Sequence, residues 1–271
     1  MIVSSPPTPL CSVYGPVNSW RYGRSLGIDP IGPISTCPFN CVYCQLGEIV
    51  HPSDRRQVFV PTEKILTDLQ GFAPWDVDAI TLSGSGEPTL ALNLGEIIDG
   101  IKAITDPPVV VLTNGALLTD PDVRQALARA DKVSIKLDAI CQSQLRRVNR
   151  PLDSINIRTI KAGVEAFRSE FLGDFALQTM LLSPWSDEAR DRYIQIVLWL
   201  APDEVQLNVP SRPKPRQHET QSRGNCSRAD LPDSARQFRL VDPATVADFA
   251  TEIETATGVP VRYPALRSQT H

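Results

Sequence analysis

"PVVVLTNGALLTDPDVRQALARADKVSIKLD", residues 108–138, carries the pattern that decides the fold of this chain. It opens with an aliphatic run, 108–114, which is short and rich in β-branched residues, as strands are. A helical pattern follows at 119–130, where a Thr-Asp-Pro start signal precedes apolar residues at helical spacing. A second aliphatic run, 131–138, completes a strand–helix–strand unit, whose two strands are expected to run parallel.

The same alternation continues on both sides of this unit. Further runs rich in Val, Ile and Leu are predicted strands, at 25–33, 78–84, 175–182 and 203–210. Helical patterns are predicted at 61–72, 93–104, 154–171, 187–201 and 242–256. About six parallel strands are too few for a closed eight-stranded barrel. We therefore predict an α/β fold in which about six parallel strands form a partial, open βα barrel with outer helices.

The composition is that of an ordinary folded domain. The 271 residues are 42% hydrophobic and 21% charged, and the formal net charge is -4. This balance disfavours a protein coated in basic groups for non-specific nucleic-acid binding. No apolar run approaches the roughly 20 residues that span a bilayer, and "MIVSSPPTPL" lacks the features of a signal peptide. We expect a cytoplasmic protein without membrane contact.

Composition also divides the chain into parts. Residues 1–13 are predicted to form an N-terminal tail and residues 14–212 a core with the alternating elements. A polar loop at 213–234 follows, and 235–271 supplies a last helix and strand. The loop belongs to "SRPKPRQHETQSRGNCSRADLPDS" (211–234), which is poor in aliphatic residues. A loop of this length is usually functional or disordered.

Polar residues gather where the predicted strands end. In parallel α/β sheets, ligands bind at the carboxyl ends of the strands, on the loops that lead into the helices. Segments with cysteine, glycine or polar side chains fall at these ends: 36–47, 83–88, 113–115, 136–139, 178–180 and 208–213. They are expected to converge on one mouth, and this convergence predicts an enzyme.

"TCPFNCVYCQLG" (36–47) places Cys37, Cys41 and Cys44 in one loop. Clustered cysteines in a reducing compartment more often bind metal than form disulfides. A structural zinc site would need a fourth ligand, for which His51 is nearby. An iron–sulfur cluster ordinarily takes four thiolates, so three would leave one iron open. From spacing alone, an iron–sulfur cluster, zinc and a plain redox loop all remain possible. The other cysteines, Cys11, Cys141 and Cys226, are scattered and form no second cluster.

The context of this loop resembles a known family. "CPFNCVYC" resembles the CxxxCxxC signature of the radical S-adenosylmethionine (SAM) superfamily, including the aromatic Tyr43 before the third cysteine. "SGSGEPTL" (83–90), "LTNG" (112–115) and "IKLDA" (135–139) are similar to later segments of that family. "YGPVNSWRYGRSLGID" (14–29) is similar to the branch that groups uncharacterised Fe–S oxidoreductases with the wyosine-forming tRNA enzymes. The resemblance covers about residues 14–212.

The resemblance implies a radical SAM core and its cofactors. Cys37, Cys41 and Cys44 would hold one [4Fe-4S] cluster, whose fourth iron binds the amino and carboxylate groups of SAM. An electron from an external donor, such as a flavodoxin or ferredoxin, would cleave SAM to methionine and a 5′-deoxyadenosyl radical. That radical would abstract hydrogen from a substrate.

The resemblance also implies roles for the residues of the SAM pocket. Gly84 and Gly86 would let the backbone approach the methionine moiety, and Ser85, Gly86 and Glu87 would face its amino group. Asp138 would accept from ribose hydroxyls, and Tyr43 would lie against adenine. Further lining residues are Asn114, Gln178 and Asn208. From the residues alone, other roles stay open: the glycines fit a plain turn, Asp138 an N-cap, Lys136 a surface charge, and Gln178 and Met180 ordinary strand positions.

The substrate is less well defined. Branch resemblance and three basic stretches favour tRNA; the residues are Arg21, Arg24, Arg146, Arg147, Arg150 and, in the loop 212–228, Arg212, Lys214, Arg216, Arg223 and Arg228. The wyosine-forming enzymes use a second cluster, for which this chain offers no cysteine set. Surface charge, a small metabolite, or an activase that places a radical on a partner's glycine are alternatives. A further alternative is a non-catalytic iron–sulfur or zinc module. Cys226 could relay a radical or be an ordinary thiol.

Overall fold

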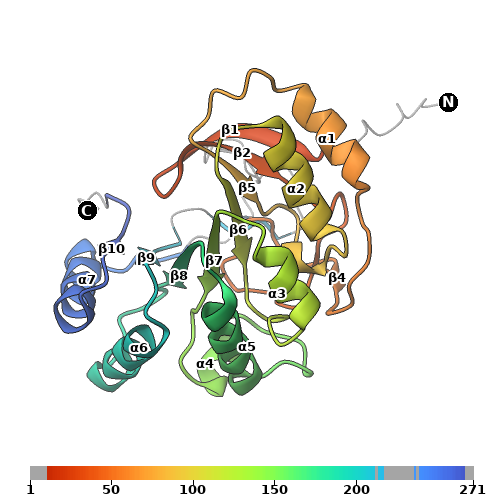
Figure 1. The fold of residues 1–271 in the computed structure, drawn as a ribbon. Helices are drawn as coiled ribbons and strands as arrows, with labels where there is room; N and C mark the ends of the chain where they lie inside the picture. The colour runs from red at the N-terminus through yellow and green to blue at the C-terminus, as the bar shows by residue number, and fades with distance from the viewer. Residues whose placement is uncertain (1–10, 211–212, 217–234, 236–237, 266–271) are drawn as a thin grey trace.

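The computed structural model describes residues 11–210, 213–216, 235 and 238–265. Its main sheet has eight strands in the order β1-β2-β5-β6-β7-β8-β9-β10 (Figure 1). Their bounds are β1 (Val13–Ser19), β2 (Gly23–Ile28), β5 (Ala79–Leu82), β6 (Val109–Thr113), β7 (Lys132–Lys136), β8 (Asp174–Met180), β9 (Glu204–Asn208) and β10 (Val261–Arg262). A second, two-stranded sheet joins β3 (Thr36–Cys37) and β4 (His51–Pro52).

The helices lie between the strands. They are α1 (Thr62–Gln70), α2 (Leu94–Ile104), α3 (Pro121–Leu127), α4 (Gln142–Val148), α5 (Ile157–Glu170), α6 (Asp187–Leu200) and α7 (Pro243–Thr257), with a short 3-10 turn, η1 (Pro88–Leu90). Side-chain caps begin several of them. Asp120 accepts from the backbone N–H of Asp122 at α3, and Ser186 accepts from that of Ala189 at α6. In the described ranges, no helix is long and apolar enough to cross a membrane.

The six predicted strands are β2 and β5 to β9, and each pairs in parallel with the next. The sheet curls into an open half-barrel with helices on its outer side (Figure 1), which confirms the predicted partial barrel. The sequence prediction omitted β1, which pairs antiparallel with β2 at one edge. At the other edge, β10 pairs in parallel with β9. Because β1 starts at Val13, the sheet begins inside the segment predicted as a tail.

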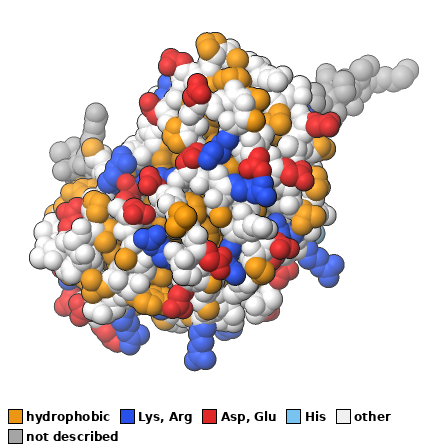
Figure 2. Space-filling view, in the orientation of Figure 1, with side chains coloured by type: hydrophobic (Ala, Val, Ile, Leu, Met, Phe, Trp, Pro, Cys, Tyr) orange, Lys and Arg blue, Asp and Glu red, His pale blue; other side chains and the backbone are white. Residues whose placement is uncertain are grey.

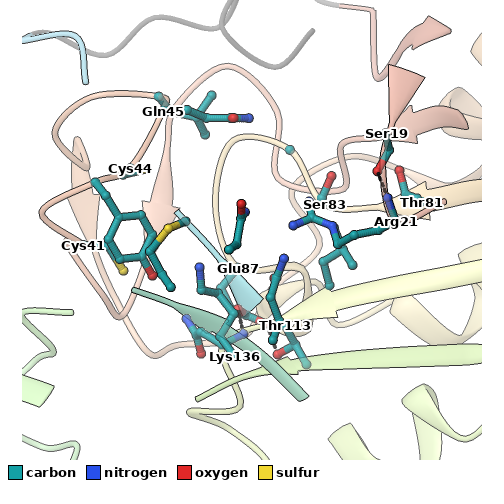
Figure 3. Close-up of a pocket in the computed structure, with 18 of the residues that line it drawn as sticks. Ser19, Arg21, Cys41, Cys44, Gln45, Thr81, Ser83, Glu87, Thr113 and Lys136 are labelled. Atoms are coloured by element: carbon teal, nitrogen blue, oxygen red, sulfur yellow. Dashed lines mark hydrogen bonds between the residues drawn. The ribbon is translucent and has the colours of Figure 1, made fainter. Parts of the chain in front are cut away.

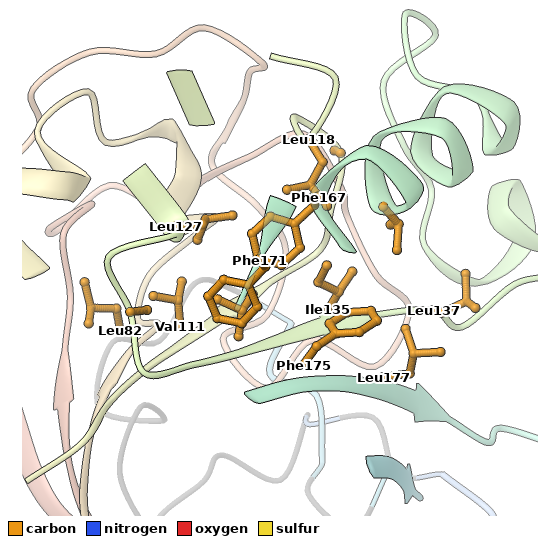
Figure 4. Close-up of a cluster of buried hydrophobic side chains, with 14 of the residues drawn as sticks. Leu82, Val111, Leu118, Leu127, Ile135, Leu137, Phe167, Phe171, Phe175 and Leu177 are labelled. Carbon is orange, nitrogen blue, oxygen red and sulfur yellow. The ribbon is translucent and has the colours of Figure 1, made fainter. Parts of the chain in front are cut away.

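The outer face of the sheet forms the hydrophobic core. Side chains alternate between the faces along each strand, and the outward ones pack against the helices: Leu26, Ile80, Val111, Val133, Leu177 and Val205. Aromatic rings from α5 and β8 fill the centre of this layer (Figure 4). Phe167 stacks on Phe171 with ring centroids 4.8 Å apart and meets Phe175 edge-on at 6.3 Å.

The inner face of the half-barrel is polar. Its buried residues include Ser25, Thr81, Ser134, Gln178 and Gln206, each directly beside an outward apolar residue in sequence. A parallel sheet packed on both faces is normally apolar on both. Buried hydroxyls and amides require hydrogen-bond partners, so the inner face is suited to a polar ligand.

Candidate functional site

A cavity of about 380 Å³ lies on the inner face of the half-barrel (Figure 3). This volume falls within the roughly 300–1,000 Å³ typical of ligand sites. The cysteine loop forms one end of the cavity. The β1–β2 turn, Trp20 to Tyr22, lines the other end. Between them the wall is formed by the carboxyl ends of the parallel strands, as predicted for ligand sites in such sheets.

Cys37, Cys41 and Cys44 all line this cavity. Their loop is attached to the C-terminal end of α4: the N–H of Asn40 donates to the carbonyl of Asn149 at 3.0 Å, and that of Val42 donates to the carbonyl of Val148 at 2.9 Å. His51 pairs through its backbone with Thr36, its side chain is exposed, and it does not line the cavity. Nothing in this geometry brings His51 to the three thiols as a fourth ligand.

N–H groups surround two of the sulfur atoms. The side-chain amide of Asn149 donates to Cys41 Sγ at 3.4 Å, and that of Asn114 lies 3.6 Å from Cys37 Sγ. The backbone N–H of Phe39 also donates to Cys37 Sγ, at 3.4 Å. Donors of this kind orient sulfur ligands of iron–sulfur clusters and tune their potential.

Burial raises the pKa of all three thiols, that of Cys41 to about 11. Without a bound cation they are therefore neutral, and a metal is what would favour their thiolate forms. Yet among the described residues no group of three His, Cys, Asp or Glu side chains converges closely enough to hold a single metal ion. In a multi-iron cluster each thiolate binds a different iron, so the three thiols need not converge on one point.

The glycine-rich segment packs directly against the cysteine loop. A Cβ on Gly86 would lie 1.8 Å from the carbonyl oxygen of Thr36, and a Cβ on Gly84, whose φ is +109, would lie 2.5 Å from Asp29 Cγ. Both glycines line the cavity. Glycine is therefore required at these two positions because the protein's own chain lies so close. The sequence interpretation explained the two glycines by close approach of the methionine moiety of SAM.

Ser85 was predicted to face the amino group of SAM, but the structure places it away from the cavity. Its side chain is fully buried outside the cavity lining, and its hydroxyl donates to Asp29 Oδ2 at 2.6 Å. The other oxygen of Asp29 accepts from the backbone N–H groups of Ile31 and Gly32, each at 3.0 Å. Ser85 and Asp29 thus join the glycine-rich segment to the chain that leads into the cysteine loop. The sequence interpretation missed Asp29, because nothing in its local pattern marks the contact.

Glu87 lines the cavity, and protein donors already occupy much of its carboxylate. Oε1 accepts from the backbone and hydroxyl of Thr89 at 3.2 and 2.7 Å and from the hydroxyl of Thr113 at 2.5 Å. Oε2 accepts from the backbone N–H of Asn114 at 2.8 Å. Burial raises the pKa of Glu87, and these hydrogen bonds oppose the shift. A carboxylate has about four lone-pair sites, so Oε2 retains capacity for a ligand ammonium group.

Asp138 does not line this cavity. Its carboxylate accepts from the Tyr43 hydroxyl, from the Asn149 amide at 2.7 Å and from the backbone N–H of Met180 at 2.8 Å. The structure thus uses the predicted ribose acceptor to hold Tyr43 and the cysteine loop against β7 and β8. Tyr43 itself lines the cavity, with the Lys136 ammonium 4.5 Å from its ring centroid.

The remaining predicted lining residues are brought together. Asn114, Gln178 and Asn208 line the cavity, as do Met180 and Lys136. Lys214 is buried beside the cysteine loop, where its ammonium donates to the carbonyl of Cys41 at 3.2 Å and pairs with Glu48 at 2.7 Å. The ammonium groups of Lys214 and Lys136 oppose the effect of burial on the pKa of Cys44.

Among the described residues, the basic side chains predicted to contact RNA lie in different surroundings. Arg21 lines the cavity, and Arg24 pairs with Asp76 at 3.1 Å. The side chains of Arg146, Arg147, Arg150 and Arg216 are exposed. Arg212, Arg223, Arg228 and Cys226 lie outside the described residues. On the face shown in Figure 2, basic and acidic side chains are interspersed.

The β1–β2 turn, which we call the floor (Trp20 to Tyr22), was not part of the predicted site. The hydroxyl of Tyr22 shares a 2.6 Å hydrogen bond with Ser134 Oγ inside the half-barrel. Arg262 of β10 donates to the carbonyl of Trp20 at 2.8 Å and to that of Arg21 at 3.1 Å. These long-range contacts fix the floor beneath the open amino end of the sheet.

Comparisons with known proteins place the chain by a family model, by sequence relatives and by fold. A family model described as "Radical SAM superfamily" matches residues 31–197. The chain is 55% identical over 252 residues to the UPF0026 protein slr1464 of Synechocystis sp., over 93% of this chain and 95% of that protein. Its structure resembles a radical SAM methyltransferase from Sphaerobacter thermophilus, with a TM-score of 0.61 and 16% identity over 89% of this chain and 67% of that one. It also resembles Streptococcus suis SuiB bound to S-adenosylmethionine, with a TM-score of 0.59 and 12% identity over 87% of this chain and 49% of SuiB. At these identities, structural likeness shows a shared fold.

Proposed function

Because the chain belongs to the radical SAM superfamily, we propose that Cys37, Cys41 and Cys44 hold a [4Fe-4S] cluster with which the protein cleaves SAM. The observation that carries the proposal is the set of three buried thiols at one end of a polar cavity, with amide donors at two of the sulfurs. SAM would bind the iron that no cysteine holds. When bound, the cluster would supply an electron to the sulfonium, giving methionine and a 5′-deoxyadenosyl radical that takes hydrogen from a substrate.

The protein's own residues would bind and orient SAM. Oε2 of Glu87 is suited to the amino group of SAM, because a carboxylate forms a charge-assisted hydrogen bond with an ammonium. Tyr43 offers a ring face for the adenine, and the bonds from its hydroxyl and from Asn149 to Asp138 hold that ring in place. Enclosure by the half-barrel would keep water from a reactive intermediate. An external electron donor, such as a flavodoxin or ferredoxin, would reduce the cluster.

The test is anaerobic reconstitution of the full chain with iron and sulfide, followed by SAM and a strong reductant. We expect a brown protein that releases 5′-deoxyadenosine. Cys37→Ser, Cys41→Ser and Cys44→Ser should each lose cluster binding and SAM cleavage, by about 100-fold or more. Cys141→Ser is the matched control, because Cys141 does not line the cavity. A colourless protein that binds zinc, or variants that cleave SAM as the wild type does, would contradict the proposal.

A further inference from the structure

We propose that the substrate is a small molecule with a phosphate or carboxylate group, which binds the guanidinium of Arg21 at the floor of the cavity. This inference rests on the proposed function, because it concerns the part of the same cavity that lies away from the cysteines. Nothing in the family resemblance assigns a role of this kind to Arg21.

Arg21 lies at the opposite end of the cavity from the cysteine loop. The floor precedes β2 and the cysteine loop follows it, and β2 is a strand of 6 residues. At about 3.3 Å per residue β2 spans roughly 20 Å, which separates the backbone of the floor from the start of the chain that leads into the cysteine loop. Figure 3 shows Arg21 extending from the turn into the cavity beside Ser83, with the cysteines on the far side. A group bound at Arg21 therefore belongs to a different part of the ligand space from a SAM held at the cysteines.

The backbone of Arg21 is fixed before any ligand binds. Its N–H donates to Ser19 Oγ at 3.2 Å, and its carbonyl accepts from Arg262 at 3.1 Å. The guanidinium lies 5.3 Å from the ring centroid of Trp20 and 5.8 Å from that of Tyr22. Tyr22 is in turn held by Ser134. A guanidinium supported in this way loses little freedom when it binds a planar anion.

The charges in the cavity favour an anion at the floor. Among the described lining residues, the cationic side chains are Arg21 and Lys136, and the carboxylate is Glu87. Glu87 lies at the carboxyl ends of the strands, where its carboxylate accepts from Thr113 and Asn114. A guanidinium in a partly enclosed site recognises carboxylate or phosphate through two parallel hydrogen bonds.

The cavity wall around Arg21 is suited to the part of a polar metabolite that lies outside its anionic group. Ser25, Thr81 and Ser83 line the cavity along β2 and β5, with Ser25 nearest the floor and Ser83 at the carboxyl end of β5, where its hydroxyl shares a 2.7 Å hydrogen bond with that of Tyr14. Val110 and Leu112 add a small apolar surface beside Tyr22. Single-stranded nucleic acid is usually bound by a groove with repeated basic side chains. An arginine at the bottom of a half-barrel matches one terminal anionic group of a compact molecule better.

The experiment is calorimetric titration of the anaerobic holoenzyme, saturated with SAM, with inorganic pyrophosphate and with citrate. We expect at least one probe to bind the wild type, and the tighter one indicates phosphate or carboxylate chemistry. Arg21→Gln should weaken that binding by about tenfold or more, because a charge-assisted hydrogen bond is lost. Arg21→Lys should recover part of it. Arg24→Gln, an exposed arginine of the same hairpin, is the matched control and should bind both the probe and SAM as the wild type does.

Three results would overturn the inference. The first is that neither probe binds the wild type. The second is that Arg21→Gln and Arg21→Lys bind a probe as tightly as the wild type does. The third is that tRNA binds, that this binding is lost when Arg146, Arg147 and Arg150 are replaced, and that Arg21→Gln binds tRNA normally. Release of 5′-deoxyadenosine by the same wild-type preparation separates this inference from the proposed function. Cleavage without Arg21-dependent anion binding refutes only the inference. Arg21-dependent binding without cleavage refutes only the proposed function.

Discussion

At the cysteine end of the cavity, the three thiols belong to one loop, residues 37–44, whereas at the floor Tyr22 reaches Ser134, 112 positions away along the chain. The three thiols come from one short motif, although long-range contacts, such as those of Asn149 and Lys214 to Cys41, hold their loop in place. The floor is a turn that contacts β7, β9 and β10 through side chains. A local motif can therefore define a cofactor end, while the end facing a substrate depends on how distant strands pair.

If Asp138 holds the cysteine end together, removing its carboxylate should affect the whole fold. Asp138→Ala leaves the Asn149 amide and the Met180 N–H without their acceptor in a buried place. We expect a loss of about 4 kcal/mol in the free energy of unfolding, measured in urea. Asp76→Ala, at an exposed ion pair, should change it by less than about 0.5 kcal/mol. If Asp138→Ala leaves the free energy of unfolding unchanged but weakens SAM binding, Asp138 binds the ribose hydroxyls, as the family resemblance implies.

The packing of the glycine-rich segment gives the next largest effect. Gly86→Ala places a methyl group against the carbonyl of Thr36, and overpacking of this kind costs about 3 kcal/mol. Gly258→Ala is the control, because a Cβ there meets no atom within 4 Å and only its φ of +70 is unfavourable. That control should cost about 1 kcal/mol. Equal costs in urea unfolding would mean that Gly86 is not in contact with the cysteine loop.

At the floor, a single hydroxyl should have a smaller effect. Tyr22→Phe removes the partner of Ser134, which is fully buried, so we expect a loss of about 1–2 kcal/mol in the free energy of unfolding. The exposed Tyr263 provides the control variant Tyr263→Phe, for which no measurable change is expected. If both variants unfold at the same urea concentration, the hydrogen bond between Tyr22 and Ser134 is absent in solution.

The smallest expected effect is the pH dependence of the stability that the Glu204 carboxylate contributes. Burial alone would raise the pKa of Glu204, but Gln206, Lys132 and Arg262 lower it below its usual value. Because the folded pKa is depressed, the ionised carboxylate stabilises the fold above its ordinary pKa of about 4.3, and this contribution is lost as the pH falls through the lower, folded value. Glu204→Gln should cost about 1 kcal/mol at neutral pH and nearly nothing below about pH 3, after allowing for partial exposure.

Urea unfolding at neutral and acid pH measures this difference. Glu188→Gln breaks an exposed pair with Arg192 and should leave the free energy of unfolding unchanged at either pH. A cost for Glu204→Gln that is the same at both pH values would mean that its charge does not contribute.

The strands that carry the site could be predicted from sequence because their alternation with helices is regular. β1 was missed because Gly15 and Pro16 interrupt its pattern; the structure accommodates them at an irregularity between Tyr14 and Val17 of an edge strand. α4 was missed because it has only 7 residues and its N-cap residue, Cys141, provides no side-chain cap. Neither feature leaves a periodic signal.

For the site, too, the sequence predicts what regular strand order determines and misses contacts between distant residues. The cysteines, Glu87, Asn114, Gln178 and Asn208 line one cavity, as expected where the strand ends of a parallel sheet meet. The partners of Asp138 and Ser85 could not be predicted, since Tyr43 lies 95 positions from Asp138 and Asp29 lies 56 from Ser85. Arg21 was predicted as a possible RNA contact, with surface charge as the alternative, because the direction of a side chain in a turn is not encoded by periodicity.

The most direct test of the central claim is electron paramagnetic resonance of the reduced, reconstituted protein, recorded before and after SAM is added. Three thiolates and one open iron predict iron and sulfide in the stoichiometry of a [4Fe-4S] cluster. They also predict a spectrum that changes when SAM binds, and Cys141→Ser should behave in the same way. A spectrum that SAM leaves unchanged, or a protein without iron, would contradict the account.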